Sequence, residues 1–471
     1  MKKKTFLIMI ALFAATSWLR SQDISGNWQG ELHIMGQKLR IIFHIEKKDT
    51  LYTTIMDSPD QGAYGLPTDR TGVADNQLEI VAAGMGILYR GKLENDSITG
   101  IFSQGGISIP LTLQRAVSVL RPQRPPTPEP PYPYRIEEVT IENKQAGLTL
   151  AGTLTFPETI GPFPALVLIA GSGPNDRDET IFGHRPFLVL SDHLTRNGFA
   201  VLRYDKRGIG ASKGEYTKAT TDDFAQDAAA AVAFLRSRKD IDKRHINLIG
   251  HSEGGIIASM VAANDKKIDG IILLAGMGMK GIDLIMAQNE NGMSQQNLEP
   301  ENREKMVVIL RETLETLSVW QGTPADQTAL NDRLIRLWEA TPLLVRLKQN
   351  REQFLRSNFN AMVTPWYRRF LQIDPETFLK KVSCPVLALN GEKDTQVRAE
   401  ENLTAIESAL KEGKNRHITV QRYPELNHLF QECTTGQADE YAVIEETFSP
   451  TVLNDILSWL QETGGTLSSG K

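Results

Sequence analysis

The sequence has few of the residues that would point to a metal centre, a disulfide scaffold or a nucleic-acid surface. It contains only 2 cysteines, Cys384 and Cys433, so at most one disulfide can form and a multi-cysteine zinc site is excluded. Its 52 Lys and Arg are outnumbered by 57 Asp and Glu, which gives a net charge of -5 and no basic excess for nucleic acid. With 41% hydrophobic and 23% charged residues, the composition is that of a globular protein. We therefore expect no metal, no cofactor and no nucleic-acid partner.

Long hydrophobic runs are also missing, apart from one at the N-terminus. Lys2, Lys3 and Lys4 precede an apolar run from Thr5 to Ala15. That run is too short to span a bilayer, which needs about 20 residues. The pattern predicts a signal peptide over residues 1–22, with an uncleaved membrane anchor as the alternative. We expect an exported protein, periplasmic or secreted, with no stable membrane insertion once the signal is removed.

Two further patterns separate a first domain from the rest of the chain. Residues 23–117 alternate at period 2, as in Leu39–Ile45 and Ile107–Leu113, and contain no helix-period stretch. This alternation predicts a small all-β barrel or sandwich. Residues 121–134 then read RPQRPPTPEPPYPY, with seven of the chain's 23 prolines. Because proline fixes φ and lacks an amide donor, we predict an extended linker over residues 118–135.

From residue 136 to residue 471 the pattern changes to alternating strands and helices. Ile136–Glu142 and Leu148–Phe156 predict an antiparallel strand pair. Continuous apolar runs such as Phe163–Ala170 and Ile271–Ala275 are typical of strands buried on both faces, and helical stretches lie between them. This order predicts an α/β fold with a doubly wound, mostly parallel sheet, whose sites lie at the carboxyl ends of strands.

One insertion interrupts that alternation. About 110 residues separate Ile271–Ala275 from the next buried strand, Val386–Leu389, far more than a crossover requires. Apolar residues recur there at three- and four-residue spacing. We predict a helical cap over about residues 277–380, with helices at Leu298–Trp320, Ala325–Ala340 and Leu344–Phe359.

The most informative motif is Gly250-His251-Ser252-Glu253-Gly254, which follows a predicted strand and precedes a predicted helix. The G-x-S-x-G form in that position is typical of a nucleophile elbow, where a serine hydroxyl protrudes from a tight turn. Small flanking residues let the turn close and the helix pack on the strand. We predict that Ser252 is a nucleophile, with an ordinary β–α turn as the alternative.

A nucleophilic serine needs a base and an orienting carboxylate, which follow the serine in this order of elements. Asp394 lies just past the strand Val386–Leu389, whereas its competitor Glu392 lies nearer the strand end. Of the 8 histidines only His417 and His428 come after Asp394, and His417 begins a strand at the wrong edge. We therefore predict a triad of Ser252, Asp394 and His428.

The reaction also needs two backbone amides to hold a developing oxyanion. One is expected from Glu253, the residue after the nucleophile. The other is expected from the loop after Phe163–Ala170, where Ser172 is preferred, Gly173 is the second choice and Pro174 has no amide. The side chains of His251 and Glu253 are expected to pack or to face solvent.

Taken together, the segments AGSGPNDRD, YDKRGIGAS, GHSEGG and PVLALNGEKDTQV and the loop of His428 resemble an α/β-hydrolase over about residues 136–465. They are most similar to EstD-type carboxylesterases and serine aminopeptidase-like hydrolases. The resemblance implies the same triad, and a glycine expected shortly before the histidine is replaced by Leu426-Asn427. Asp205 and Arg207, in the second segment, are interpreted as structural.

The sequence thus predicts a serine hydrolase that cleaves small carboxylic esters through an acyl-enzyme. A peptide-cleaving aminopeptidase and a thioesterase are the alternatives, and a non-catalytic binding protein is disfavoured because the Ser-Asp-His order is intact. Gly173, Trp366, Tyr367 and Phe370 are candidate pocket residues, although the aromatic side chains would equally well anchor the cap. Natural substrate, acyl length and oligomeric state have no signal in the sequence.

Overall fold

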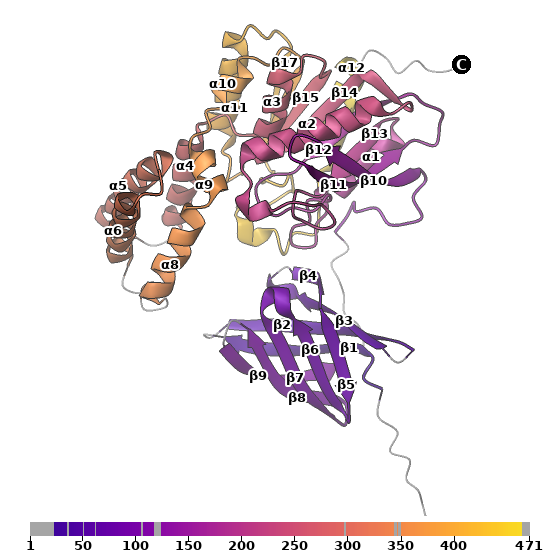
Figure 1. Ribbon diagram of the computed structural model, residues 1–471, viewed down its shortest axis with the longest axis vertical. Helices are drawn as coiled ribbons and strands as arrows, with labels where there is room; N and C mark the ends of the chain where they lie inside the picture. Colours follow the sequence, from indigo (N-terminus) through magenta and orange to yellow (C-terminus); the bar gives the residue numbers. More distant parts are fainter. Residues whose placement is uncertain are drawn as a thin grey trace, which may run out of the picture. The chain divides into compact units, whose positions relative to one another are not determined.

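The computed structural model describes residues 23–34, 37–49, 51–61, 63–104, 107–116, 124–295, 298–342, 346 and 350–463. The signal peptide predicted over residues 1–22 and the first part of the predicted linker therefore lie outside the described residues. The chain divides into two compact units, Met1–Arg121 and Pro122–Lys471. Each unit is coloured by sequence in Figure 1.

The N-terminal unit is an antiparallel barrel. Its strands follow the order β2-β1-β9-β8-β7-β6-β5-β3-β4, and an additional pairing of β2 with β3 closes the ring. Trp28, Phe43 and Tyr89 are fully buried in its interior, as the period-2 alternation requires. The strands are β1 Gly26–Ile34, β2 Gln37–Lys48, β3 Leu51–Ser58, β4 Ala63–Pro67, β5 Arg70–Ala74, β6 Gln77–Ala82, β7 Ile87–Glu94, β8 Ser97–Gln104 and β9 Ile107–Arg115.

The second unit is built on an 8-stranded sheet with the order β10-β11-β13-β12-β14-β15-β16-β17. The pairs β10–β11 and β11–β13 are antiparallel and the remaining pairs are parallel. This confirms the doubly wound, mostly parallel sheet of an α/β-hydrolase fold. The strands are β10 Arg135–Asn143, β11 Leu148–Phe156, β12 Phe163–Ile169, β13 Ala200–Tyr204, β14 Ile241–His251, β15 Gly270–Leu274, β16 Val386–Gly391 and β17 Ile418–Tyr423.

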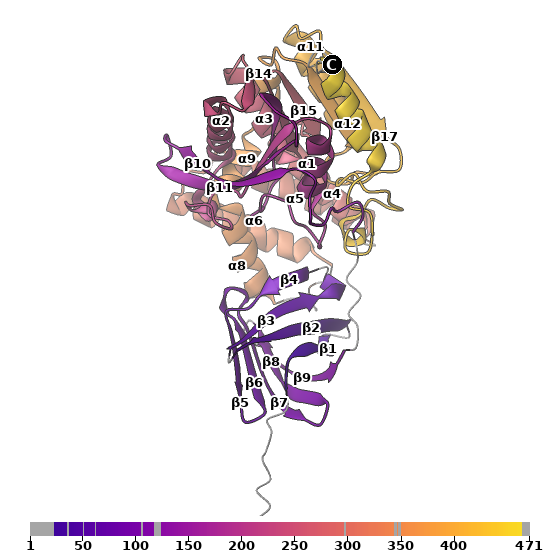
Figure 2. The ribbon, with the colours of Figure 1, turned by 90° about the vertical axis from the view of Figure 1, so that its right-hand side faces the viewer.

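Helices cover both faces of this sheet (Figure 2). Helices α1 (Pro186–Arg196) and α12 (Pro450–Thr463) contribute to the apolar layer on one face. Helices α2 (Thr221–Ser237), α3 (Glu253–Asn264) and α11 (Ala399–Glu412) contribute to the layer on the other. The inner strands are therefore buried on both sides, which explains their continuous apolar sequences.

The long insertion is helical, and its apolar core, to which Leu314, Leu330 and Leu334 contribute, continues onto residues of α3. In Figure 1, α4 and α9 connect the outer helices α5, α6 and α8 to the α/β core. The predicted helix Leu298–Trp320 is present with shorter bounds, and the predicted helix Ala325–Ala340 begins one residue earlier in the structure. Part of the third predicted helix lies outside the described residues, and α4, α9 and α10 were not predicted. The helices are α4 Gly281–Ser294, α5 Pro300–Ser318, α6 Pro324–Ala340, α8 Arg351–Met362, α9 Pro365–Leu371 and α10 Glu376–Leu379.

None of the helices in the described part of the chain has the length and apolar character needed to cross a bilayer.

Candidate active site

Ser252 occupies a strained turn between β14 and α3. Its φ of 52° and ψ of -119° are unusual for a residue with a side chain, and such backbone strain is typical of functional sites. A Cβ added to Gly250 would lie 2.0 Å from the carbonyl oxygen of Gly254. A Cβ added to Gly254 would lie 2.0 Å from the carbonyl oxygen of Ile169 on β12. The two glycines of G-x-S-x-G are thus required by contact with backbone atoms.

Asp394 and His428 lie beyond the carboxyl ends of β16 and β17. His428 Nδ1 lies 2.7 Å from Asp394 Oδ2, and both side chains are buried. Asp394 Oδ1 accepts hydrogen bonds from the amides of Gln396 at 2.8 Å and Val397 at 2.9 Å, which fix the carboxylate. Since Nδ1 faces the carboxylate, Nε2 is the nitrogen left for a serine hydroxyl. The competitor Glu392 is exposed.

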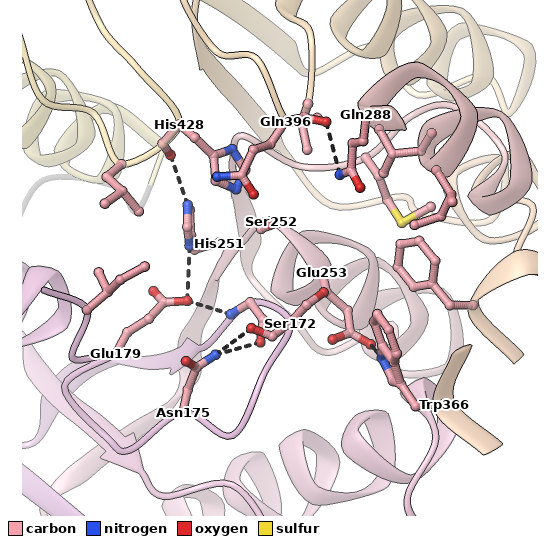
Figure 3. Close-up of a pocket in the computed structure, with 18 residues that line it drawn as sticks. Ser172, Asn175, Glu179, His251, Ser252, Glu253, Gln288, Trp366, Gln396 and His428 are labelled. Carbon is pink, nitrogen blue, oxygen red and sulfur yellow. Dashed lines mark hydrogen bonds and ion pairs between the residues drawn. The ribbon is translucent and has the colours of Figure 1, made fainter. Parts of the chain in front are cut away.

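Ser252 and His428 line one cavity of about 200 Å³ (Figure 3). Of the four candidate pocket residues, Trp366 and Phe370 are among its lining residues, whereas Gly173 and Tyr367 are not. The ring of Tyr367 instead packs against the apolar core of the cap. The lining residues are Gly171, Ser172, Asn175, Glu179, Ile181, His251, Ser252, Glu253, Met277, Leu284, Ile285, Gln288, Trp366, Phe370, Gln396, Val397, His428 and Leu429.

The loop after β12 presents its amides in different directions. The Gly171 amide donates to Glu179 Oε1 at 2.6 Å. Burial raises the pKa of the Tyr216 phenol to about 12, and an interaction with the backbone of Gly173 opposes that rise. Ser172 lines the cavity and Gly173 does not, so Ser172 is the better placed of the two for a ligand. Glu253, which is expected to supply the other amide, lines the same cavity, and both oxyanion roles stay predictions.

The side chains on either side of Ser252 are both buried, so neither faces solvent. His251 Nδ1 lies 3.0 Å from Glu179 Oε1, and His251 Nε2 lies 3.0 Å from the carbonyl oxygen of His428. Both ring nitrogens face acceptors, an arrangement that favours the doubly protonated imidazolium form of His251. Burial lowers the pKa of His251, but the charge and hydrogen bond of Glu179 outweigh it and the pKa is raised.

Glu253 is equally enclosed. Its Oε1 accepts from Thr221 Oγ1 at 2.7 Å and from Trp366 Nε1 at 2.7 Å. Its Oε2 lies 3.6 Å from Nζ of Lys206, a buried lysine just after β13. Sequence reasoning missed Lys206. The available signal was a lysine directly past the carboxyl end of a buried strand, where sites of this fold gather.

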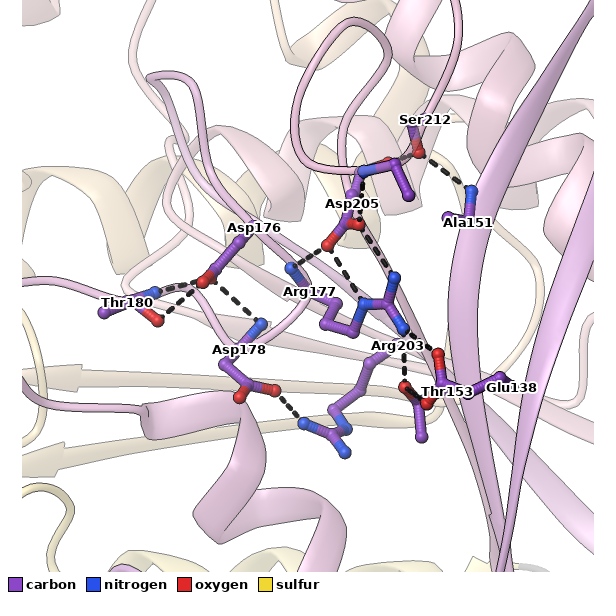
Figure 4. Close-up of polar contacts among 11 residues, drawn as sticks. Glu138, Ala151, Thr153, Asp176, Arg177, Asp178, Thr180, Arg203, Asp205 and Ser212 are labelled. Carbon is purple, nitrogen blue, oxygen red and sulfur yellow. Dashed lines mark hydrogen bonds and ion pairs between the residues drawn. The ribbon is translucent and has the colours of Figure 1, made fainter. Parts of the chain in front are cut away.

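The segments AGSGPNDRD and YDKRGIGAS meet in a network of polar contacts (Figure 4). Asp205 accepts from the amide of Arg177 at 2.9 Å and from its guanidinium at 3.0 and 2.8 Å. Arg177 also donates to Thr153 Oγ1 at 2.7 Å on β11. Arg207 pairs with Asp227 at 2.7 Å. Asp205 and Arg207 thus make structural contacts, and Asp205 joins the loop after β12 to the turn after β13.

Within the residues that the structure describes, no group of three or more His, Cys, Asp or Glu side chains is arranged to hold a metal ion.

Comparison with known proteins places this site in a family. A family model described as "Serine aminopeptidase, S33" matches residues 186–432. An esterase of Thermotoga maritima, EstD, is 33% identical over 196 residues, which cover 41% of this chain and 47% of that protein. The chain therefore spans less than half the length of that relative.

Two other similarities are more distant. A non-heme chloroperoxidase of Burkholderia pyrrocinia is 24% identical over 267 residues, covering 54% of this chain and 87% of that protein. The solved structure of an esterase from Pyrococcus furiosus covers 74% of this chain and 100% of its own, with 15% identity and a TM-score of 0.45.

Proposed function

The chain belongs to the serine aminopeptidase S33 family of α/β hydrolases, and we propose that it is a carboxylesterase whose triad is Ser252, His428 and Asp394. The observation that carries the proposal is the pairing of His428 Nδ1 with Asp394 Oδ2 at 2.7 Å beside the strained Ser252. The esterase named among its relatives agrees with this choice of substrate.

The proposed reaction uses each group in one role. Ser252 Oγ adds to the ester carbonyl carbon while His428 Nε2 takes its proton. Asp394 stabilises the imidazolium, and the amides of Ser172 and Glu253 hold the oxyanion. The proton on His428 then leaves with the alcohol, and water repeats the sequence on the acyl-enzyme.

The charges around the cavity favour an ester over a peptide with a free amino terminus. An aminopeptidase needs a carboxylate that is available to bind the substrate's ammonium group. The two glutamates that line the cavity are already opposed by cations, since Glu179 lies beside His251 and Glu253 beside Lys206. An ammonium group would compete with these buried cations, whereas a neutral ester would not.

The cavity also limits the size of the substrate. Its volume is about 200 Å³, and Leu284, Ile285 and Phe370 give it an apolar wall on the side of the cap. We therefore propose small esters with short acyl groups as substrates.

Export is a separate proposal. Lys2–Lys4 and the apolar run after them support it, so the mature chain would act in the periplasm or outside the cell. Fractionation of cells that express the full chain, followed by N-terminal sequencing, tests this. An intact N-terminus in the cytosolic fraction would contradict it.

Hydrolysis assays test the enzyme proposal. The wild type should release p-nitrophenol from p-nitrophenyl acetate and butyrate, and Ser252→Ala should lower kcat by on the order of 10⁶. Ser458→Ala changes an exposed serine on α12 and serves as the matched control. Cleavage of leucine p-nitroanilide in preference to both esters would favour the peptidase alternative.

A further inference from the structure

Lys206 is a buried charge that the proposed reaction does not use. Its residue is 4% exposed, and fully buried lysines are rare unless they are paired. Nζ donates a hydrogen bond to the carbonyl oxygen of Gly171 and lies 3.6 Å from Glu253 Oε2. The ammonium therefore touches the loop after β12 and the residue after the nucleophile at once.

The carbonyl that Lys206 holds shares a peptide unit with the Ser172 amide. In a trans peptide the C=O and the N–H point in opposite directions. The same carbonyl oxygen also accepts from Asn175 Nδ2 at 2.8 Å, so two donors fix it. With the oxygen held on the side of Lys206, the Ser172 N–H must point away from that lysine. The preceding peptide unit is fixed as well, since the Gly171 amide donates to Glu179.

We propose that Lys206 is a positioning residue that orients and polarises the Ser172 amide of the oxyanion hole. The proposal rests on the proposed function, because it assigns that amide to the oxyanion. A hydrogen bond to a peptide carbonyl polarises the N–H of the same unit, and a charged donor does so more strongly. The Lys206 ammonium thus acts through the peptide without touching substrate.

The carboxylate of Glu253 stabilises the positive charge of Lys206 in its buried position. Burial lowers the pKa of Lys206, and the carboxylate of Glu253 opposes that change. The backbone of Glu253 supplies the other proposed oxyanion amide. Through Lys206, the carboxylate of Glu253 is therefore connected to the peptide unit that carries the Ser172 amide.

The experiment compares Lys206→Met with wild type on p-nitrophenyl butyrate. We expect kcat to fall by about 10- to 100-fold, since loss of a whole oxyanion donor costs about 10²–10³, with KM changed less than about twofold. Inhibition by a trifluoromethyl ketone should weaken by the same factor. In its adduct Ser252 Oγ bonds to the ketone carbon, the carbonyl electron pair becomes an oxyanion, and the proton passes to His428. Lys213→Met, at an exposed lysine in the same turn, is the control.

Two further variants keep the test decisive. Lys206→Met leaves the carboxylate of Glu253 unpaired. The double variant Lys206→Met/Glu253→Gln is therefore compared with Glu253→Gln alone, so that the effect of Lys206 on kcat is measured in the absence of that carboxylate. Asn175→Ala removes the second donor to the Gly171 carbonyl and should show a smaller loss with the same pattern.

The outcomes separate this proposal from the proposed function. If the double variant matches Glu253→Gln in kcat, or if the loss lies in KM while ketone inhibition is unchanged, Lys206 has only a structural role. If wild type hydrolyses none of the esters, the proposed function itself fails.

Discussion

The ion pair of Glu179 and His251 gives the sharpest stability prediction. His251 is 7% exposed and Glu179 is 5% exposed, so the imidazolium has little access to water. Glu179→Gln keeps the shape of the side chain and an acceptor for the Gly171 amide, but removes the charge opposite His251. Breaking a buried pair by removing one partner costs about 3–5 kcal/mol. At about 2 °C per kcal/mol for a large domain, Tm should fall by at least about 6 °C.

Differential scanning calorimetry at pH 6 measures this change. The pKa of His251 is raised in the folded state, so its stabilisation is fully present below the unfolded pKa of about 6.5. That stabilisation is lost as the pH rises through the folded pKa. The difference in Tm between wild type and Glu179→Gln should therefore shrink at alkaline pH.

A double-mutant cycle decides whether the two charges act together. Glu179→Gln/His251→Asn removes both charges and should be more stable than Glu179→Gln alone, since no buried charge is left unpaired. The control is Glu138→Gln, a carboxylate whose side chain is 70% exposed and paired with Arg177, which should change stability by less than about 1 kcal/mol. If Glu179→Gln melts with wild type at pH 6 and the double variant is the least stable, the pair is not ionised and the reasoning is refuted.

Three other perturbations follow from the same contacts. Asp394→Asn should lower kcat on p-nitrophenyl butyrate by on the order of 10⁴, because the His428 tautomer is no longer fixed. The near-UV circular dichroism should stay unchanged, and activity near that of wild type would contradict the triad. Gly254→Ala places a Cβ 2.0 Å from the Ile169 carbonyl oxygen and should abolish ester hydrolysis, whereas Gly292→Ala, with no atom within 4 Å of the added Cβ, should be tolerated. Burial, followed by the charge of Arg124, lowers the pKa of His184 to about 4, so the unfolded chain binds more protons between pH 4 and about 6.5. Stability should therefore drop by about 3 kcal/mol over that range as the pH falls, and urea unfolding should show a smaller drop for His184→Gln.

The parts of the molecule that the sequence predicts well are those that follow from local pattern and chain order. Buried strands can be recognised by their continuous apolar runs, and Ser252 and Asp394 each follow the end of a buried strand. His428 follows β17, a strand of mixed polar and apolar sequence that is mostly not buried. Because the carboxyl ends of parallel strands meet at one edge, residues far apart in sequence could be expected at one site. The oxyanion role of Ser172 stays a prediction, made from the need for an amide in a loop of small residues.

The parts that escaped prediction depend on contacts between distant loops. Nothing in the local sequence of Lys206 indicates that its ammonium reaches the carbonyl of Gly171 or the carboxylate of Glu253. The burial of His251 likewise follows from the approach of Glu179 and of the His428 loop. Tyr367 was a candidate pocket residue as one of the aromatic residues in the segment that ends the predicted cap, but its ring packs against the cap core. Side-chain direction on a short helix depends on packing that periodicity alone does not specify.

Covalent labelling tests the central claim, that Ser252 is the activated nucleophile, most directly. Wild type is treated with a fluorophosphonate, digested and analysed by mass spectrometry, with Ser252→Ala as the comparison. The phosphonyl adduct is expected on the peptide that contains Ser252 and nowhere in the variant. Failure to label wild type, or equal labelling of Ser252→Ala at another residue, would contradict the assignment.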